Sequence, residues 1–326
     1  TVDTQTIASS EGATGSDGGD GSGSESIAKA VDNGGSTTEG DLQVAAALSL
    51  NEIDAQTTAK IDALNAVNTS GNISVTAKDI LAINAKADGS TVSPSASGVG
   101  VGVAINTGVI GTTAIINSET HSNGVVIKAE TQTPNNENTF SAESISGAGA
   151  SEVGIAGSFA RNNTAITTEA LISGNANVDA GGGHVVIDSQ SDIDIETKAK
   201  SSAEGGSDSV GVGASIALSF ADIITSAELQ DNATLSNLDD LNVTANATRQ
   251  VMTLSEGGSQ GGIAITPALS FSNVEHTTLA RVGLGSTLNL MGSLTVTSSV
   301  LSSTIEVIAD AEAVGTEVLV GATLAI

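Results

Sequence analysis

A segment of about 55 residues recurs along this chain and constrains its fold more than any other feature. A short apolar run marks six copies, spaced 51 to 61 positions apart, at 48–50, 103–105, 157–159, 218–220, 269–271 and 324–326. A fixed period that tolerates insertions is typical of repeat architectures, in which one unit cannot bury its apolar face alone and stacks on its neighbours. We therefore expect an elongated array of stacked units.

The repeat runs from end to end, and no break in composition divides the 326 residues. We predict a single array with units at about 1–70, 71–122, 123–182, 183–238, 239–292 and a partial unit at 293–326. The chain begins at Thr1 and opens and closes partway through a unit. We expect it to be a window of a longer protein, with any secretion signal or anchor outside it.

Aromatic residues make up 1% of the chain, and Trp and Tyr are absent, although 39% of the residues are hydrophobic. The interior must therefore consist of Ala, Val, Ile, Leu, Gly and Ser. Side chains of this size suit a narrow, flat core between closely spaced sheets. They suit a wide globular core poorly, because aromatic side chains normally supply much of its buried area.

Each unit contains four strand-like blocks. The first two alternate apolar and polar residues, as half-buried strands do, and the second is the more polar. The third alternates Gly, Ala or Ser with β-branched residues, and the fourth carries a Thr-Thr or Thr-Ser pair that could form a hydroxyl ladder with its neighbours. The first blocks lie at 73–77, 125–129, 185–189, 241–245 and 294–298, the second at 1–9, 80–87, 139–146, 192–199 and 304–311, and the pairs at 57–58, 112–113, 167–168, 225–226 and 277–278.

Loops of variable length follow the second block, at 10–41, 88–98, 147–151 and 256–262. Length variation at one fixed place predicts that these loops project outward. The pattern favours an all-β, elongated parallel β-solenoid with two or three coils per unit. Three coils would advance about 14 Å per unit, and the chain would span roughly 85 Å. The rival fold is an antiparallel sandwich array, but the tight Asn-Gly or Asp-Gly hairpins that it needs are scarce.

The third block, seen at 99–105 and 210–218, presents Gly, Ala and Ser on one face. Gly weakens a strand unless another backbone comes close to it. We expect this block to be buried on both faces, with its small-residue face against a neighbouring sheet or chain. The apolar small-residue faces therefore predict a homo-oligomer or polymer. Pro267 interrupts the pattern and predicts a bulge or a local edge.

The formal net charge is −27, from 37 acidic and 10 basic residues. Nucleic acid and anionic membranes need Lys and Arg as partners, so we expect neither. No apolar run approaches the roughly 20 residues that a membrane-spanning helix requires, so we expect no membrane insertion in this segment. The absence of cysteine excludes thiol catalysis, Cys-ligated zinc and iron–sulfur centres.

We assign no catalytic residue and expect no enzyme activity. His121, His184 and His276 lie far apart and share no position in the unit, which predicts ordinary surface histidines. No nucleophile elbow or phosphate-binding loop opens a helix. Polysaccharide-cleaving β-helices need paired carboxylates or a basic residue in a groove, with aromatic residues for sugar stacking, and this chain is poor in both Trp/Tyr and basic residues.

One loop offers carboxylates for a metal ion. Asp17 and Asp20, in the Gly- and Ser-rich stretch 16–22, could bind Ca²⁺, which takes six to eight oxygen ligands in such turns. The alternative is a solvated acidic loop. No other cofactor is expected. Ice binding is disfavoured, because it needs Thr on every coil at about 4.8 Å and the Thr pairs occur once per unit.

The stretch 209–245, SVGVGASIALSFADIITSAELQDNATLSNLDDLNVTA, resembles repeats of giant bacterial surface and secreted proteins. These include filamentous-haemagglutinin-like and autotransporter-passenger-like β-solenoid adhesins. The resemblance implies an extracellular or cell-surface location and a role in adhesion or in fibre or sheath formation. Two functions follow as expectations: a structural filament, stalk or sheath that self-associates, or an adhesin whose projecting loops, above all 10–41, contact a receptor or glycan.

Overall fold

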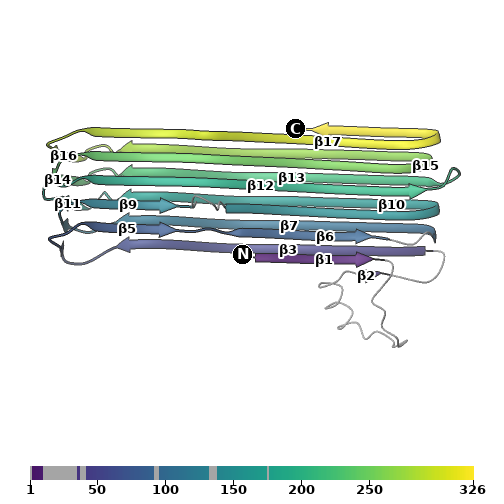
Figure 1. Ribbon diagram of the computed structural model, residues 1–326, viewed down its shortest axis with the longest axis horizontal. Helices are drawn as coiled ribbons and strands as arrows, with labels where there is room; N and C mark the ends of the chain where they lie inside the picture. The colour runs from purple at the N-terminus through teal and green to yellow at the C-terminus, as the bar shows by residue number, and fades with distance from the viewer. Residues whose placement is uncertain (1, 10–34, 37–41, 92–94, 132–137, 175) are drawn as a thin grey trace, which may run out of the picture.

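The computed structural model describes residues 2–9, 35–36, 42–91, 95–131, 138–174 and 176–326. All regular structure in these residues is β-strand, and no helix is found among them. Figure 1 shows long, nearly straight strands lying side by side in a flat stack, with the N-terminal strands at one end and the C-terminal strands at the other. The expected all-β fold with parallel sheets is confirmed.

Each unit contributes a long outward strand, a short strand at the turn and a return strand. The outward strands are β3 (Leu42–Ile61), β7 (Ser95–Ile116), β13 (Val210–Leu229) and the later parts of β10 (Asn138–Ile172), β15 (Leu241–Val282) and β17 (Leu294–Ala325). The return strands are β1 (Val2–Ser9), β5 (Ile73–Lys78), β6 (Ala82–Ser90), β9 (Val125–Glu130), β12 (Val185–Gly205) and the earlier parts of β10, β15 and β17. The turn strands are β4 (Val67–Asn68), β8 (Thr120–His121), β11 (Asn177–Asp179), β14 (Thr234–Leu238) and β16 (Thr287–Leu290).

Equivalent strands of successive units pair in parallel and in register. The first blocks start at paired positions, in the order Ile73, Val125, Val185, Leu241 and Leu294. β2 (Gly35–Ser36) is the exception among the described strands, because it pairs antiparallel with β3. Parallel pairing throughout the rest excludes the antiparallel sandwich.

The expectation of two or three coils per unit is wrong. A residue pairs with the residue about one full unit away, as Leu48 does with Val103 and Leu269 with Leu324. Each unit therefore adds one outward and one return strand and advances by one strand spacing, about 4.8 Å. The reason is strand length: the 20 residues of β3 extend about 66 Å at 3.3 Å per residue. Two such strands and their turns use up a whole unit, so the long axis in Figure 1 runs along the strands.

The apolar markers at 157–159 and 218–220 are two residues out of register. Val103 pairs with Phe159, which pairs with Ile216, and Ile216 pairs with Leu269. A slip of two residues keeps every side chain on the same face of a strand, so an alternating sequence does not reveal it.

The outward and return strands form two layers whose separation is set by the glycines. A Cβ added to Gly100 would lie 2.1 Å from the carbonyl oxygen of Gly147, and one added to Gly213 would lie 2.0 Å from that of Gly258. Toward the turn strands the inward residues become larger, and Ile116, Ile127, Ile172, Ile187 and Leu229 pack there. The small-residue face of the third block therefore lies against the return strands of its own chain, while its β-branched face is on the surface. The expectation that both faces are buried is wrong.

The predicted short loops at 147–151 and 256–262 are also wrong, because they fall within β10 and β15. Only register shifts, at Ala150/Val153 and at Gly261/Ile263, mark the tight turns there. Pro267 produces no bulge, since the register against β13 is the same on either side of it. Instead, Gly213 and Ala214 of β13 have no paired residue in β15, as expected where proline removes a backbone donor.

The Thr pairs align in adjacent strands, with Thr57, Thr112, Thr168, Thr225 and Thr278 in register. The hydroxyls face inward, and the three central ones are fully buried. Thr225 Oγ1 lies 2.6 Å from Ser191 Oγ of the return layer. Contrary to the expected wide spacing, these threonines recur on five adjacent outward strands, but the ladder lies in the core and not on an ice-accessible surface.

A ladder of asparagine side chains crosses the core and was not foreseen. Asn51 Nδ2 donates to Asn106 Oδ1 at 2.9 Å, and Asn106 Nδ2 donates to Asn162 Oδ1 at 3.0 Å. Asn162 Nδ2 then donates to Thr197 Oγ1 at 2.8 Å. The same amides also bond to return-strand carbonyls, as Asn106 does to Ser141 O at 2.6 Å. The ladder therefore ties adjacent units and both layers together.

Candidate functional site

The two broad surfaces of the molecule differ in chemistry. We call the solvent-facing surface of the first half of β7, β10, β13, β15 and β17 the aliphatic face. In β7 it consists of the side chains of Ser97, Val99, Val101, Val103 and Ile105. In the other four strands it consists of the residues in register with these five. Among these described residues Arg161 is the only charged one and Ser97 the only other polar one. The face exists because one alternation of the third block carries Val, Ile, Leu and Phe.

Large side chains remain exposed in the middle of this face. Val101, Ile216 and Ile265 are each 37% exposed, and Ile155 is 42% exposed. These residues belong to strands with paired neighbours on both sides, so their exposure does not come from an open edge. Scattered exposed aliphatic residues are common, but contiguous ones mark interaction surfaces.

The return strands present charged side chains on the opposite surface. Ion pairs cross from one unit to the next, with Lys86 Nζ 2.8 Å from Glu143 and Lys200 Nζ 2.6 Å from Glu256. Lys198 also pairs with Glu196 along one strand. Exposed ion pairs of this kind contribute little stability, so the main effect of these charged side chains is to keep the return-strand surface solvated.

Beyond the aliphatic face, the second half of the outward strands carries polar and charged side chains on the same surface. Arg281 there donates from Nη2 to Glu228 at 2.6 Å and from Nη1 to Asp231 at 3.0 Å. Burial, together with the charge of Glu228, raises the pKa of Glu169. The aliphatic face is therefore bounded along the strands by ionic residues.

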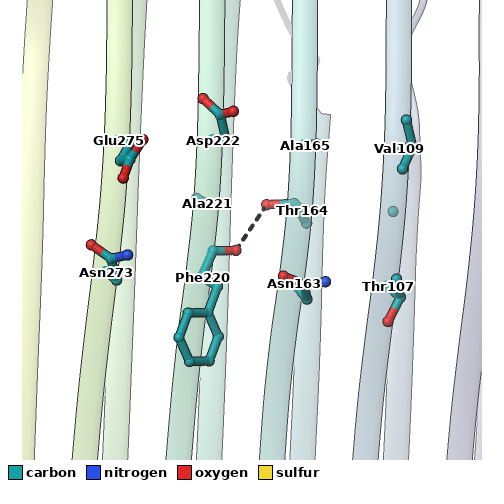
Figure 2. Close-up of a pocket in the computed structure, with 11 residues that line it drawn as sticks. Thr107, Val109, Asn163, Thr164, Ala165, Phe220, Ala221, Asp222, Asn273 and Glu275 are labelled. Atoms are coloured by element: carbon teal, nitrogen blue, oxygen red, sulfur yellow. Dashed lines mark hydrogen bonds between the residues drawn. The ribbon is translucent and has the colours of Figure 1, made fainter.

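A shallow hollow of about 290 Å³ lies at this boundary, over β7, β10, β13 and β15. Figure 2 shows the ring of Phe220 beside the amides of Asn163 and Asn273, with the carboxylates of Asp222 and Glu275 further along the strands. The guanidinium of Arg161 lies 5.2 Å from the centre of the Phe220 ring. An aromatic ring flanked by amides and carboxylates is chemically suited to a polar ligand with an apolar side, such as a sugar.

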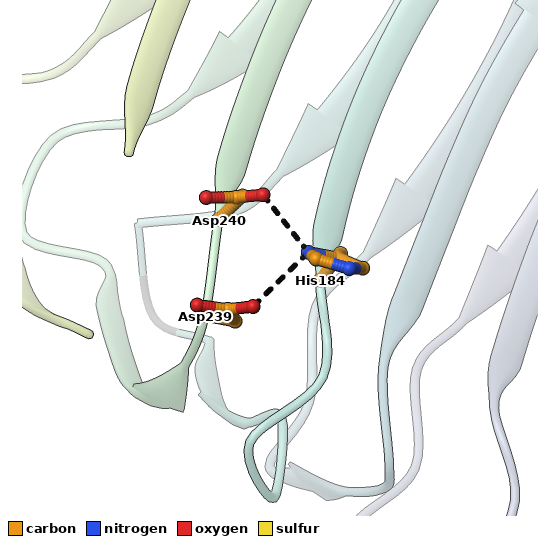
Figure 3. Close-up of side chains that lie close together, drawn as sticks. All are labelled: His184, Asp239 and Asp240. Carbon is orange, nitrogen blue, oxygen red and sulfur yellow. Dashed lines mark ion pairs between the residues drawn. The ribbon is translucent and has the colours of Figure 1, made fainter. Parts of the chain in front are cut away.

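One group of side chains has the composition of a metal site. His184 Nδ1 lies 3.2 Å from Asp240 Oδ2 and 3.9 Å from Asp239 Oδ2, as Figure 3 shows. His184 directly precedes β12, and the two aspartates directly precede β15, so the turns of neighbouring units bring them together. All three are exposed or half-buried, and Asp240 also accepts a hydrogen bond from the backbone of Ser293 at 2.7 Å. Exposed acidic groups of this kind are common without a metal ion, so the grouping by itself assigns no metal site.

The other two histidines differ from each other. His121 lies at the turn, with Nε2 3.1 Å from Glu119 and Nδ1 3.6 Å from Asp179. His276 is not an ordinary surface histidine, because it occupies the inward position taken by Ile110, Ile166 and Ile223 in the neighbouring strands. Burial, and secondly the charge of Arg249, lowers the pKa of His276 to about 4.

The predicted calcium ligands Asp17 and Asp20 lie outside the described residues, as does the loop 10–41 apart from Gly35–Ser36. Sequence reasoning missed the grouping of His184 with Asp239 and Asp240. The signal was available, because His184 and Asp240 both stand immediately before the first block of their units.

Comparison with known protein families, with curated proteins and with solved structures finds no match to this chain. In the part of the chain that the structure describes, no helix is long and apolar enough to cross a membrane.

Proposed function

We propose that this chain is a non-enzymatic structural element, a filament, stalk or sheath, built as a parallel β-solenoid with one wide, flat coil per repeat. In-register parallel pairing of equivalent strands one unit apart supports the solenoid. The exposed aliphatic face carries the proposal of self-association, because a chain that acts alone in water gains nothing from leaving such a surface open.

We place the protein outside the cell or at its surface. This rests on the resemblance of 209–245 to repeats of surface proteins, and the acidic, cysteine-free composition is compatible with it. No cofactor is proposed beyond the calcium expected at Asp17 and Asp20.

Electron microscopy of the purified chain over a range of concentrations, with and without calcium, tests the proposal. We expect particles larger than one chain, in fibres or sheets, that become more abundant with concentration. Monodisperse short particles under every condition would contradict self-association. Turnover of acidic polysaccharides, abolished by a single carboxylate substitution, would contradict the non-enzymatic assignment.

A second candidate is an adhesin that contacts a receptor or glycan, and the hollow around Phe220 favours it. Binding of soluble glycans, measured by calorimetry, should then weaken by about 3- to 10-fold in Phe220→Ala, since contacts with an aromatic ring contribute about 0.5–1.5 kcal/mol beyond the area that they bury. Equal binding by the wild type and Phe220→Ala would reject the hollow and leave the predicted loop 10–41 as the binding segment.

A further inference from the structure

We propose that two copies of this chain pack against each other through their aliphatic faces, related by a twofold axis that lies in the plane of the contact, parallel to the face. This proposal deepens the proposed function, on which it rests, by naming the partner and the surface. It also replaces the expected small-residue contact, because the structure uses that face inside each chain.

The chemistry of the face selects a second copy over other partners. It has a single charged residue, Arg161, on a chain of net charge −27, so repulsion between two copies is weakest where these faces meet. Arg161 stands at the border beside Phe220 and need not be desolvated at the centre. Broad, even burial of Val, Ile and Leu is typical of sheet-on-sheet packing.

The size of the face matches that of a stable dimer. The nine positions 97–105 extend about 30 Å along the strands, and five adjacent strands extend about 24 Å across them. One copy therefore contributes roughly 700 Å², and two copies bury roughly 1,400 Å². Stable interfaces of standard size bury about 1,200 to 2,000 Å² in total.

The relief of the face is complementary to itself. Its central row of side chains is low on four adjacent strands, with Gly157, Ala214, Pro267 and Ala322, and ends at Val101 in β7. A Cβ added at Gly157 would meet no heavy atom within 4 Å, so this row is open to the outside. An apolar hollow lies over Ala214, Pro267 and Ala322 of this row, beside the row formed by Ile216, Leu269 and Leu324. Rows of larger residues flank it, so the ridges of one copy can enter the groove of another with the same strand spacing. A twofold contact needs this kind of self-complementarity.

Gly157→Lys tests the contact in the intact chain, with Gly149→Lys as its matched control. Both glycines lie in β10, and neither has an atom within 4 Å of an added Cβ, so both variants should fold. Only Gly157 is on the aliphatic face. Sedimentation equilibrium and circular dichroism then measure association and fold for the wild type and the two variants.

We expect a reversible dimer for the wild type and for Gly149→Lys, and at least about 100-fold weaker dimerisation for Gly157→Lys, because each copy would bury an unpaired ammonium. Unchanged circular dichroism shows that the effect is not a loss of fold. If Gly157→Lys assembles as well as the wild type, the face is not the contact, although self-association stands. If the wild type remains monomeric, both proposals fail, and binding of the monomer to phosphatidylcholine vesicles would then assign the face to lipid.

Discussion

Substitution of Asn106 by alanine should reveal how much the core depends on its asparagine ladder. Asn106 is 1% exposed and takes part in three hydrogen bonds shorter than 3.1 Å, with Asn51, Ser141 and Asn162. The net loss is about 1 kcal/mol for each bond. Asn162 Oδ1 would keep no donor among the hydrogen bonds found in the described residues, which costs about 1–2 kcal/mol more. We therefore expect Asn106→Ala to lower the free energy of unfolding by about 4 kcal/mol.

Asn163→Ala provides the matched control, because Asn163 is the next residue to Asn162 on the same strand but faces outward into the hollow. Its free energy of unfolding should change by less than about 0.5 kcal/mol. Urea unfolding followed by circular dichroism measures both variants. Stacked repeats can unfold in parts, so amide hydrogen exchange in β7 and β10 should locate the loss of protection around the substituted unit.

The double variant Asn106→Ala/Asn162→Ala separates the ladder from the two single sites. The Asn106–Asn162 bond is lost in both single variants, and once Asn162 is absent its oxygen no longer lacks a donor, so the double variant should lose about 2–3 kcal/mol less than the sum of the singles. A loss below about 1 kcal/mol in Asn106→Ala, or additivity in the double variant, would refute the idea that the ladder acts as a connected network.

Three further predictions concern other parts of the stack. His276 binds its proton less readily in the folded protein, with a pKa of about 4 against about 6.5 when unfolded, so its contribution to stability is complete above pH 6.5 and falls as the pH drops toward 4. His276→Ile should remove this part of the acid sensitivity, a change of about 1–2 kcal/mol in the free energy of unfolding after solvent screening. An identical pH profile of thermal unfolding in the wild type and the variant would contradict the assignment. Gly100→Ala places a Cβ 2.1 Å from a backbone oxygen and should destabilise the protein by about 3 kcal/mol or more in urea unfolding. Gly149→Ala, which has open space at its Cβ, should change the free energy of unfolding by less than about 0.5 kcal/mol. Equal effects of the two substitutions would mean that the two layers are not in contact at Gly100. Arg281→Gln should cost about 1 kcal/mol, and 1 M salt should remove the part due to Asp231, because Arg281 and Asp231 are exposed while Glu228 is only 13% exposed. A larger loss that does not depend on salt would show that the guanidinium holds the turn by packing.

Local pattern was enough to find most of the strands. Alternation of apolar and polar residues identified the return strands, and their starts at Ile73, Val125, Val185, Leu241 and Leu294 are paired in the structure. Alternation could not fix the register at Phe159 and Ile216, because a shift of two residues leaves the same residues on the same face.

The sequence by itself determined the all-β fold and the aromatic-poor core, because residue alternation and side-chain size are local properties. Only the tertiary structure decided that one unit adds one outward and one return strand, since strand ends depend on which backbones pair, and β10 and β15 run without interruption through 147–151 and 256–262. It alone also decided which side of the Gly-alternating strands is inside. Both sides are apolar in sequence, but only the glycine side lets the two layers approach, so the Val, Ile and Leu side is left to face outward.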